Sequence, residues 1–200
     1  MAKVKIKRMS TSIDMTAMCD VAFLLLTFFI LTTKFKPDEP VIVDTPSSVS
    51  EIKLPETDIL QIVIDKEDRV FFGIDGKFTR QKLLAKIGEK YQITFTPEEV
   101  ESFSLLSSFG VPVASLREFL NMDSNARGKV KQPGIPSDSL NNELSDWIWY
   151  ARLSNPRFRI AVKGDRESNY QKVKQVISTL QDRKVNKFNF ITNMENNPEV

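Results

Sequence analysis

One acidic side chain, Asp20, lies within an otherwise apolar stretch, residues 15–33. A helix of this length rises about 28 Å, which is close to the thickness of a bilayer's hydrocarbon core. An isolated carboxylate in that core costs about 2.5–3.5 kcal/mol even on lenient insertion scales. The sequence therefore predicts a membrane-spanning helix that keeps a costly acidic group for a purpose other than anchoring.

Two threonines accompany this acid at helical spacing. Thr16, Asp20 and Thr27 are related by i, i+4 and i+11, so they share one face of the helix. A polar stripe of this kind cannot face lipid cheaply and should face another helix or a wet cavity. Two interpretations follow: a proton-binding site in an ion path, or a neutral acid that hydrogen-bonds to a partner helix and holds an assembly together.

The composition excludes several kinds of chemistry. The 200 residues include no histidine and one cysteine, Cys19. Ser-His and Cys-His nucleophile pairs are therefore impossible, and so is an intrachain disulfide. A net charge of +2, without a basic patch interleaved with aromatic residues, gives no support for nucleic-acid binding. Since the sequence also has no phosphate-binding loop and no metal-ligand cluster, we predict that the protein is not an enzyme and binds no cofactor.

The charges around the apolar stretch predict its orientation. Basic residues before it outnumber those after it, which favours a cytoplasmic N-terminus, residues 1–12, and a C-terminal part across the membrane. They are Lys3, Lys5, Lys7 and Arg8 before the stretch, and Lys34 and Lys36 after it. A cleaved secretory signal shares the basic start and the apolar core, but no A-x-A site follows, and a carboxylate suits a signal poorly. We predict an uncleaved transmembrane helix at 13–34.

The next residues predict a linker and the first half of a folded domain. Residues 35–56 contain four prolines and read as an extended tether, in which residues 41–43 are able to pair as a short edge strand. Strands at 59–64 and 70–74 are rich in branched and aromatic residues. A helix with Thr79 as its N-cap then runs to about Tyr91, so the order is ββα. We interpret the acids of this region, Asp65, Asp68 and Asp75, as turn carboxylates rather than metal ligands.

Residues 93–155 predict a helical insertion. A capping box at 96–99 begins a helix whose apolar face extends to Phe109 and which ends at Gly110. A short helix follows around residues 113–120, then a polar loop at 123–139, and then a helix that starts near residue 140 and stops before Pro156. The aromatic group Trp147, Trp149 and Tyr150 is interpreted as core plus one exposed ring rather than as a ligand-stacking cluster, because its neighbours keep helical apolar spacing.

The C-terminal part predicts a βαβ unit. A half-buried strand at 157–163 is followed by an amphipathic helix from Tyr170 to about Lys184 and a last strand at 188–191. Asp165, directly after the first of these strands, is expected to cap the strand end and form a turn. Residues 57–192 are therefore predicted to form an α+β domain, and residues 193–200 a polar tail.

Residues 14–29, DMTAMCDVAFLLLTFF, resemble the membrane signature of the ExbD/TolR family of biopolymer transport proteins. The sequence departs from the family pattern at Ala17, usually proline, and at Cys19, usually isoleucine or valine. The βαβ unit also resembles the family's C-terminal half, so the resemblance covers 12–92 and 156–192. The signature matches at Met15, Thr16, Asp20, Phe23, Leu25, Leu26, Phe28 and Phe29.

This resemblance implies a fold and a function. The fold is α+β, with one N-terminal transmembrane helix in the inner membrane and a periplasmic ββα…βαβ domain, here with a helical insertion. Asp20 would be the proton-accepting carboxylate, with Thr16 and Thr27 as pore-facing support. The family works with a pentameric ExbB/TolQ-like membrane protein and a TonB-like trans-envelope protein, and two copies of its helix share one pore as a homodimer. The protein would then be a motor subunit driven by the proton motive force. A membrane-anchored periplasmic structural or binding protein remains the alternative.

Overall fold

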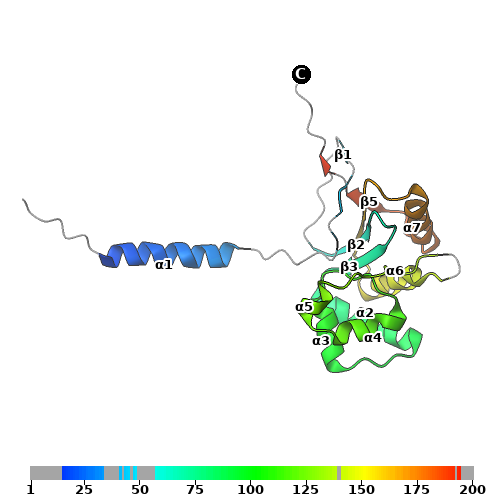
Figure 1. Ribbon diagram of the computed structural model, residues 1–200, viewed down its shortest axis with the longest axis horizontal. Coiled ribbons are helices and arrows are strands. Elements are labelled where there is room, and N and C mark those ends of the chain that lie inside the picture. The colour runs from blue at the N-terminus through cyan, green and yellow to red at the C-terminus, as the bar shows by residue number, and fades with distance from the viewer. Residues whose placement is uncertain are drawn as a thin grey trace, which may run out of the picture. The chain divides into compact units, whose positions relative to one another are not determined.

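The structure is a computed structural model of the full chain. It describes residues 15–33, 41, 43–45, 47–48, 57–138, 141–191 and 193–194. The chain divides into two compact units, Met1–Pro37 and Asp38–Val200 (Figure 1).

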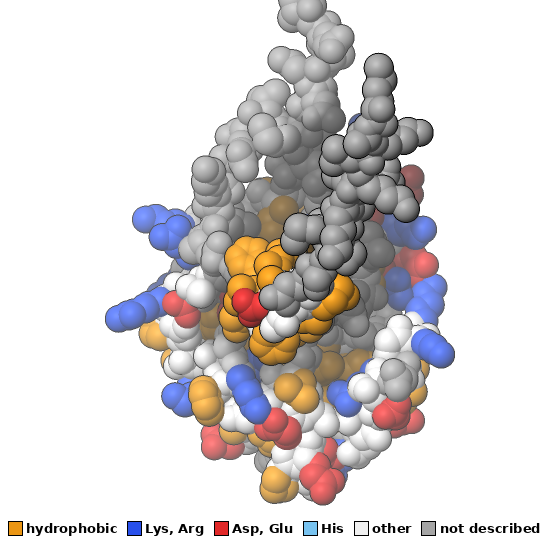
Figure 2. All heavy atoms as spheres, turned by 90° about the vertical axis from the view of Figure 1, so that its left-hand side faces the viewer, with side chains coloured by type: hydrophobic (Ala, Val, Ile, Leu, Met, Phe, Trp, Pro, Cys, Tyr) orange, Lys and Arg blue, Asp and Glu red, His pale blue; other side chains and the backbone are white. Residues whose placement is uncertain are grey.

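The first unit contains one helix, α1 (Met15–Thr32), in its described part. By length and composition it is the one described helix able to cross a membrane. Nearly all of its side chains are exposed, and Figure 2, which looks along the helix, shows hydrophobic side chains gathered around it. Residues 13, 14 and 34 of the predicted span lie outside the described residues. The predicted apolar helix is therefore present, and no acid other than Asp20 interrupts it.

The second unit is built on a four-stranded sheet in the order β3-β2-β4-β5. Strand β2 (Ile59–Ile64) pairs antiparallel with β3 (Val70–Ile74) and parallel with β4 (Arg159–Gly164), which pairs parallel with β5 (Phe188–Ile191). Helix α2 (Lys77–Tyr91) follows β3, and α7 (Tyr170–Asp182) connects β4 to β5. The predicted ββα…βαβ order is confirmed.

The main core lies between one face of this sheet and the helices. Leu60, Ile62, Ile160 and Val162 belong to it and are at most 3% exposed. Ala161, which points to the opposite face, is also fully buried. The predicted alternation along this strand is therefore wrong at its centre, because both faces of the sheet are covered there.

Part of the linker helps to cover the face of the sheet opposite the main core. Val43 packs with Val63 and Phe71 in a separate buried cluster. The neighbouring Asp44 makes two main-chain contacts with the turn after β4: its N–H donates to Asp165 Oδ2 at 3.1 Å, and its carbonyl accepts from the Arg166 N–H at 2.7 Å. The linker is thus fixed to the domain at this point.

Strand pairing in the linker occurs later than predicted. Val41 and Val43 are not in a strand, and Ile42 lies outside the described residues. Instead, β1 (Ser47–Ser48) pairs in parallel with β6 (Asn193–Met194), two residues that we expected in a polar tail. The edge-strand prediction is wrong at the two described positions, 41 and 43, and the side chain of Val43 packs against Val63 and Phe71 instead.

The insertion forms four helices in the described residues: α3 (Pro97–Leu105), α4 (Val113–Asn121), α5 (Ser124–Arg127) and α6 (Glu143–Ser154). The capping box is confirmed, since Thr96 Oγ1 accepts from the Glu99 N–H and Glu99 Oε2 accepts from the Thr96 N–H. The predicted 123–139 loop contains the short α5, and residue 139 lies outside the described part.

Two predicted helix boundaries are wrong. Helix α3 ends at Leu105, and Phe109 lies beyond it, where its N–H and carbonyl bond to Phe72 at the edge of β3. Helix α2 starts at Lys77 with Gly76, not Thr79, as its N-cap. Gly76 has a φ of 91°, which a residue with a side chain rarely adopts, so the turn from β3 into α2 needs glycine here.

Helix α6 belongs to the core rather than to the periphery. Trp147 is fully buried, and its ring lies 4.8–6.1 Å from the ring centres of Phe72, Phe103 and Phe109. Trp149, on the outer side of α6, is 42% exposed. The prediction of a core aromatic with one exposed ring is confirmed, and the insertion completes the core of the domain.

Candidate functional site

The candidate site lies on α1. Because the helix is continuous from Met15 to Thr32, the polar residues Thr16, Asp20 and Thr27 lie on one face. Asp20 and Thr27 are seven residues, about 10 Å, apart along the axis. Helical geometry thus gives the predicted stripe, and the roles of its three residues stay predictions.

Two threonine hydroxyls of α1, those of Thr27 and Thr32, bond to the helix itself. Thr27 Oγ1 donates to the Leu24 carbonyl at 2.9 Å, and Thr32 Oγ1 donates to the Phe28 carbonyl at 2.8 Å. Such bonds let a threonine stand in apolar surroundings with its hydrogen satisfied, while its oxygen can still accept a bond. By contrast, the carboxyl group of Asp20 has no hydrogen bond or ion pair to any part of the chain that the structure describes. Its carboxyl group is available to a partner outside the helix.

Two acids of the second unit, Asp65 and Asp165, serve the fold. Asp65 Oδ1 accepts from the N–H groups of Glu67 and Arg69 at 2.9 and 2.8 Å, and Asp165 Oδ1 accepts from the Glu167 N–H at 2.9 Å. Both are turn formers, as predicted. Across the described residues no group of three or more His, Cys, Asp or Glu side chains is placed to hold a metal ion.

Sequence reasoning missed the second role of Asp165, whose other oxygen binds the linker at Asp44. The sequence carries a signal for two similar turns, but none for the bond to the linker. The triplet Asp-Lys-Glu at 65–67 recurs as Asp-Arg-Glu at 165–167, after two parallel strands that pair with each other. Both turns and the linker line a cavity of about 430 Å³ with charged groups of both signs.

A single apolar helix that carries one acid, followed by a folded α+β domain, is the arrangement expected of a membrane-anchored protein. The chain belongs to the ExbD/TolR family of biopolymer transport proteins, whose model matches residues 6–195. This match includes both the apolar helix and the insertion. No curated protein and no solved structure matches the chain. Membership establishes a role related to biopolymer transport in a family of membrane-anchored proteins that are not enzymes.

Proposed function

We propose that the chain is the energy-transducing subunit of an ExbB/ExbD (TolQ/TolR)-type inner-membrane motor, driven by the proton motive force. It would support TonB-dependent or similar envelope transport. The observation that carries this proposal is Asp20, an acid without an intrachain partner among the described residues, on an apolar helix of a biopolymer-transport family. The N-terminus would be cytoplasmic and the α+β domain periplasmic.

The proposed mechanism is a cycle of charge on Asp20. Low-dielectric surroundings favour the neutral form of a carboxyl group, and a water-filled path favours the charged form. When Asp20 takes up a proton in the pore of a pentameric ExbB/TolQ-like partner, its face of α1 can turn toward apolar surroundings, and release of the proton reverses that preference. Thr16 and Thr27 extend the same face. The linker and the outer domain would pass the motion to a TonB-like trans-envelope protein.

Two copies of the chain would share one partner pore, as the family resemblance implies. A membrane-anchored structural or binding protein is the second candidate, because the outer domain has a complete core of its own. A secreted protein with a cleaved signal is less consistent with a family match that begins at residue 6 and includes α1. N-terminal sequencing of the mature protein separates that possibility from the other two.

The substitution Asp20→Asn tests the proposal, because it keeps the size of the side chain and removes its titration. We expect the variant to lose the transport that depends on the proton motive force. We also expect it to lose proton flux through the purified complex in liposomes. Co-purification with the partner membrane protein should be unchanged. Asp20→Glu, which keeps a titratable group, is the matched control and should retain part of both activities. Full function in Asp20→Asn would refute the motor.

A further inference from the structure

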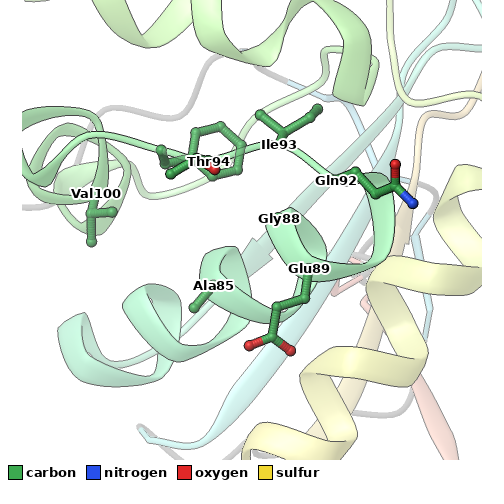
Figure 3. A pocket seen from close by; sticks show the side chains of 8 residues that line it. Ala85, Gly88, Glu89, Gln92, Ile93, Thr94 and Val100 are labelled. Atoms are coloured by element: carbon green, nitrogen blue, oxygen red, sulfur yellow. The ribbon is translucent and has the colours of Figure 1, made fainter.

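A surface pocket of about 510 Å³ lies where α2 meets the start of α3. Figure 3 shows Gly88 at its centre, with Glu89 on one side and the loop residues Ile93 and Thr94 on the other. The lining residues are Ala85, Gly88, Glu89, Gln92, Ile93, Thr94, Phe95 and Val100.

The pocket combines apolar walls with one negative charge. Ala85, Ile93, Phe95 and Val100 supply the apolar surface, and Glu89 is the charged residue among those that line it. Glu89 is exposed, and no described residue pairs with its carboxylate. A bound group that is apolar and lies beside a positive charge would complement both features.

Two further exposed apolar side chains lie on the same hairpin, which is formed by α2 and α3. Phe78 is 75% exposed and lies seven residues before Ala85, hence on the same face of α2 and about 10 Å away. Leu105, at the end of α3, is 69% exposed. Arg80, in the first turn of α2, donates to the carbonyl of Ser104, in the last turn of α3, at 2.8 Å, so Phe78 and Leu105 stand at the same end of the hairpin. Phe78 and Leu105 thus add two exposed apolar side chains to the hairpin that holds the pocket.

We propose that this hairpin surface docks a polypeptide segment of a partner protein. The segment has two apolar side chains about 10 Å apart, one in the pocket and one against Phe78, and a Lys or Arg beside the first that pairs with Glu89. A polypeptide fits better than a small molecule, because half of the lining residues are exposed and the pocket does not enclose its occupant. The proposal does not depend on proton transport by Asp20.

A pair of peptides tests the charge and the pocket separately. Acetyl-Phe-Lys-Ala-Leu-amide and the same peptide with Glu in place of Lys are titrated into the full chain in nanodiscs, with methyl NMR of Ala85 and Val100 as the readout. We expect the Lys peptide to bind about two- to fivefold more tightly, as befits an exposed ion pair. Glu89→Gln should remove this preference, and Ala85→Trp, which fills the pocket, should abolish binding of both peptides. Asp182→Asn, an exposed acid on α7, is the matched control and should change neither.

Photo-crosslinking in cells from p-benzoylphenylalanine in place of the exposed Phe78, which leaves the pocket open, then identifies the occupant. Mass spectrometry of the crosslinked peptide should find an apolar residue next to Lys or Arg in a partner protein, and Glu89→Lys should reduce the yield severalfold. A crosslink to a second copy of this chain, to lipid or to a segment without a basic residue would overturn the proposal, as would no binding of the Lys peptide or equal binding of both. Circular dichroism confirms that each variant is folded. Loss of function in Asp20→Asn leaves these outcomes unchanged, so the two proposals fail independently.

Discussion

At the scale of single residues, Glu99 shows how the fold keeps a buried carboxylate charged. The side chain is 3% exposed, and its oxygens accept bonds from Thr96 N, Arg117 Nε and Asn121 Nδ2 at 2.7–3.1 Å. Burial raises the pKa of this carboxyl group, but the three bonds and the Arg117 charge outweigh it, so the pKa lies below its usual value. The charged form therefore stabilises the insertion.

We expect Glu99→Gln to lower the free energy of unfolding by about 1.5–3 kcal/mol at neutral pH, because bonds to a charged group are lost. The contribution of Glu99 is fully present above the pKa of the unfolded chain, near 4.5, and disappears as the pH falls through the lower folded-state pKa. Denaturant unfolding at several pH values should therefore show that the difference in the free energy of unfolding between wild type and Glu99→Gln becomes smaller in acid. Glu98→Gln, on the exposed neighbour, is the control. Equal losses in both variants would contradict this account.

At the scale of elements, the sequence predicts what short-range chemistry determines. The apolar run of α1 and the Thr96–Glu99 capping box depend on residues within a few positions of each other, and both were predicted correctly. The end of α3 was not, because Phe109 leaves the helical pattern to pair with Phe72 at the edge of β3. The position at which α3 ends thus depends on a tertiary contact, and the spacing of apolar residues along the sequence does not reveal such a contact.

The same reason explains what was missed in the second unit. Asp165 was predicted to form a turn from its position after a strand, and it does. Its bond to Asp44 joins residues 121 positions apart, so no local pattern announces it. Helical periodicity alone places Thr16, Asp20 and Thr27 on one face of α1, and the roles of these residues stay predictions.

The bond between the linker and the turn after β4 leads to a prediction about Asp44. Asp44→Pro removes the N–H that donates to Asp165, whereas Asp44→Ala keeps it. Loss of one hydrogen bond, worth about 1 kcal/mol, should make amide exchange at Arg166 roughly fivefold faster in the proline variant. Hydrogen exchange followed by mass spectrometry measures this. If the alanine variant exchanges as fast as the proline variant, the main-chain bond does not hold the linker.

At the scale of the whole molecule, the outer domain contains everything that its own stability requires. The buried residues of both hydrophobic clusters lie within Asp38–Val200, from Val43 in the linker to Trp147 in α6 and Val185 after α7. None of α1 is buried. The domain therefore folds without the membrane helix. If the motor proposal is correct, transport nevertheless requires that helix.

We therefore expect residues 38–200, exported with a cleavable leader, to fold and yet fail to support transport. Cooperative thermal unfolding with a near-ultraviolet dichroism signal from the buried Trp147 would establish the fold, because that signal needs a fixed aromatic environment. Transport is then measured in cells that lack the full chain and express the released domain instead. Full-length Asp20→Asn is expressed in parallel as a comparison, because it keeps the membrane anchor and removes the titratable group. Both should be inactive in transport driven by the proton motive force. A released domain that restored transport would favour the structural or binding protein, because neither a proton on Asp20 nor a force along the linker would then be needed.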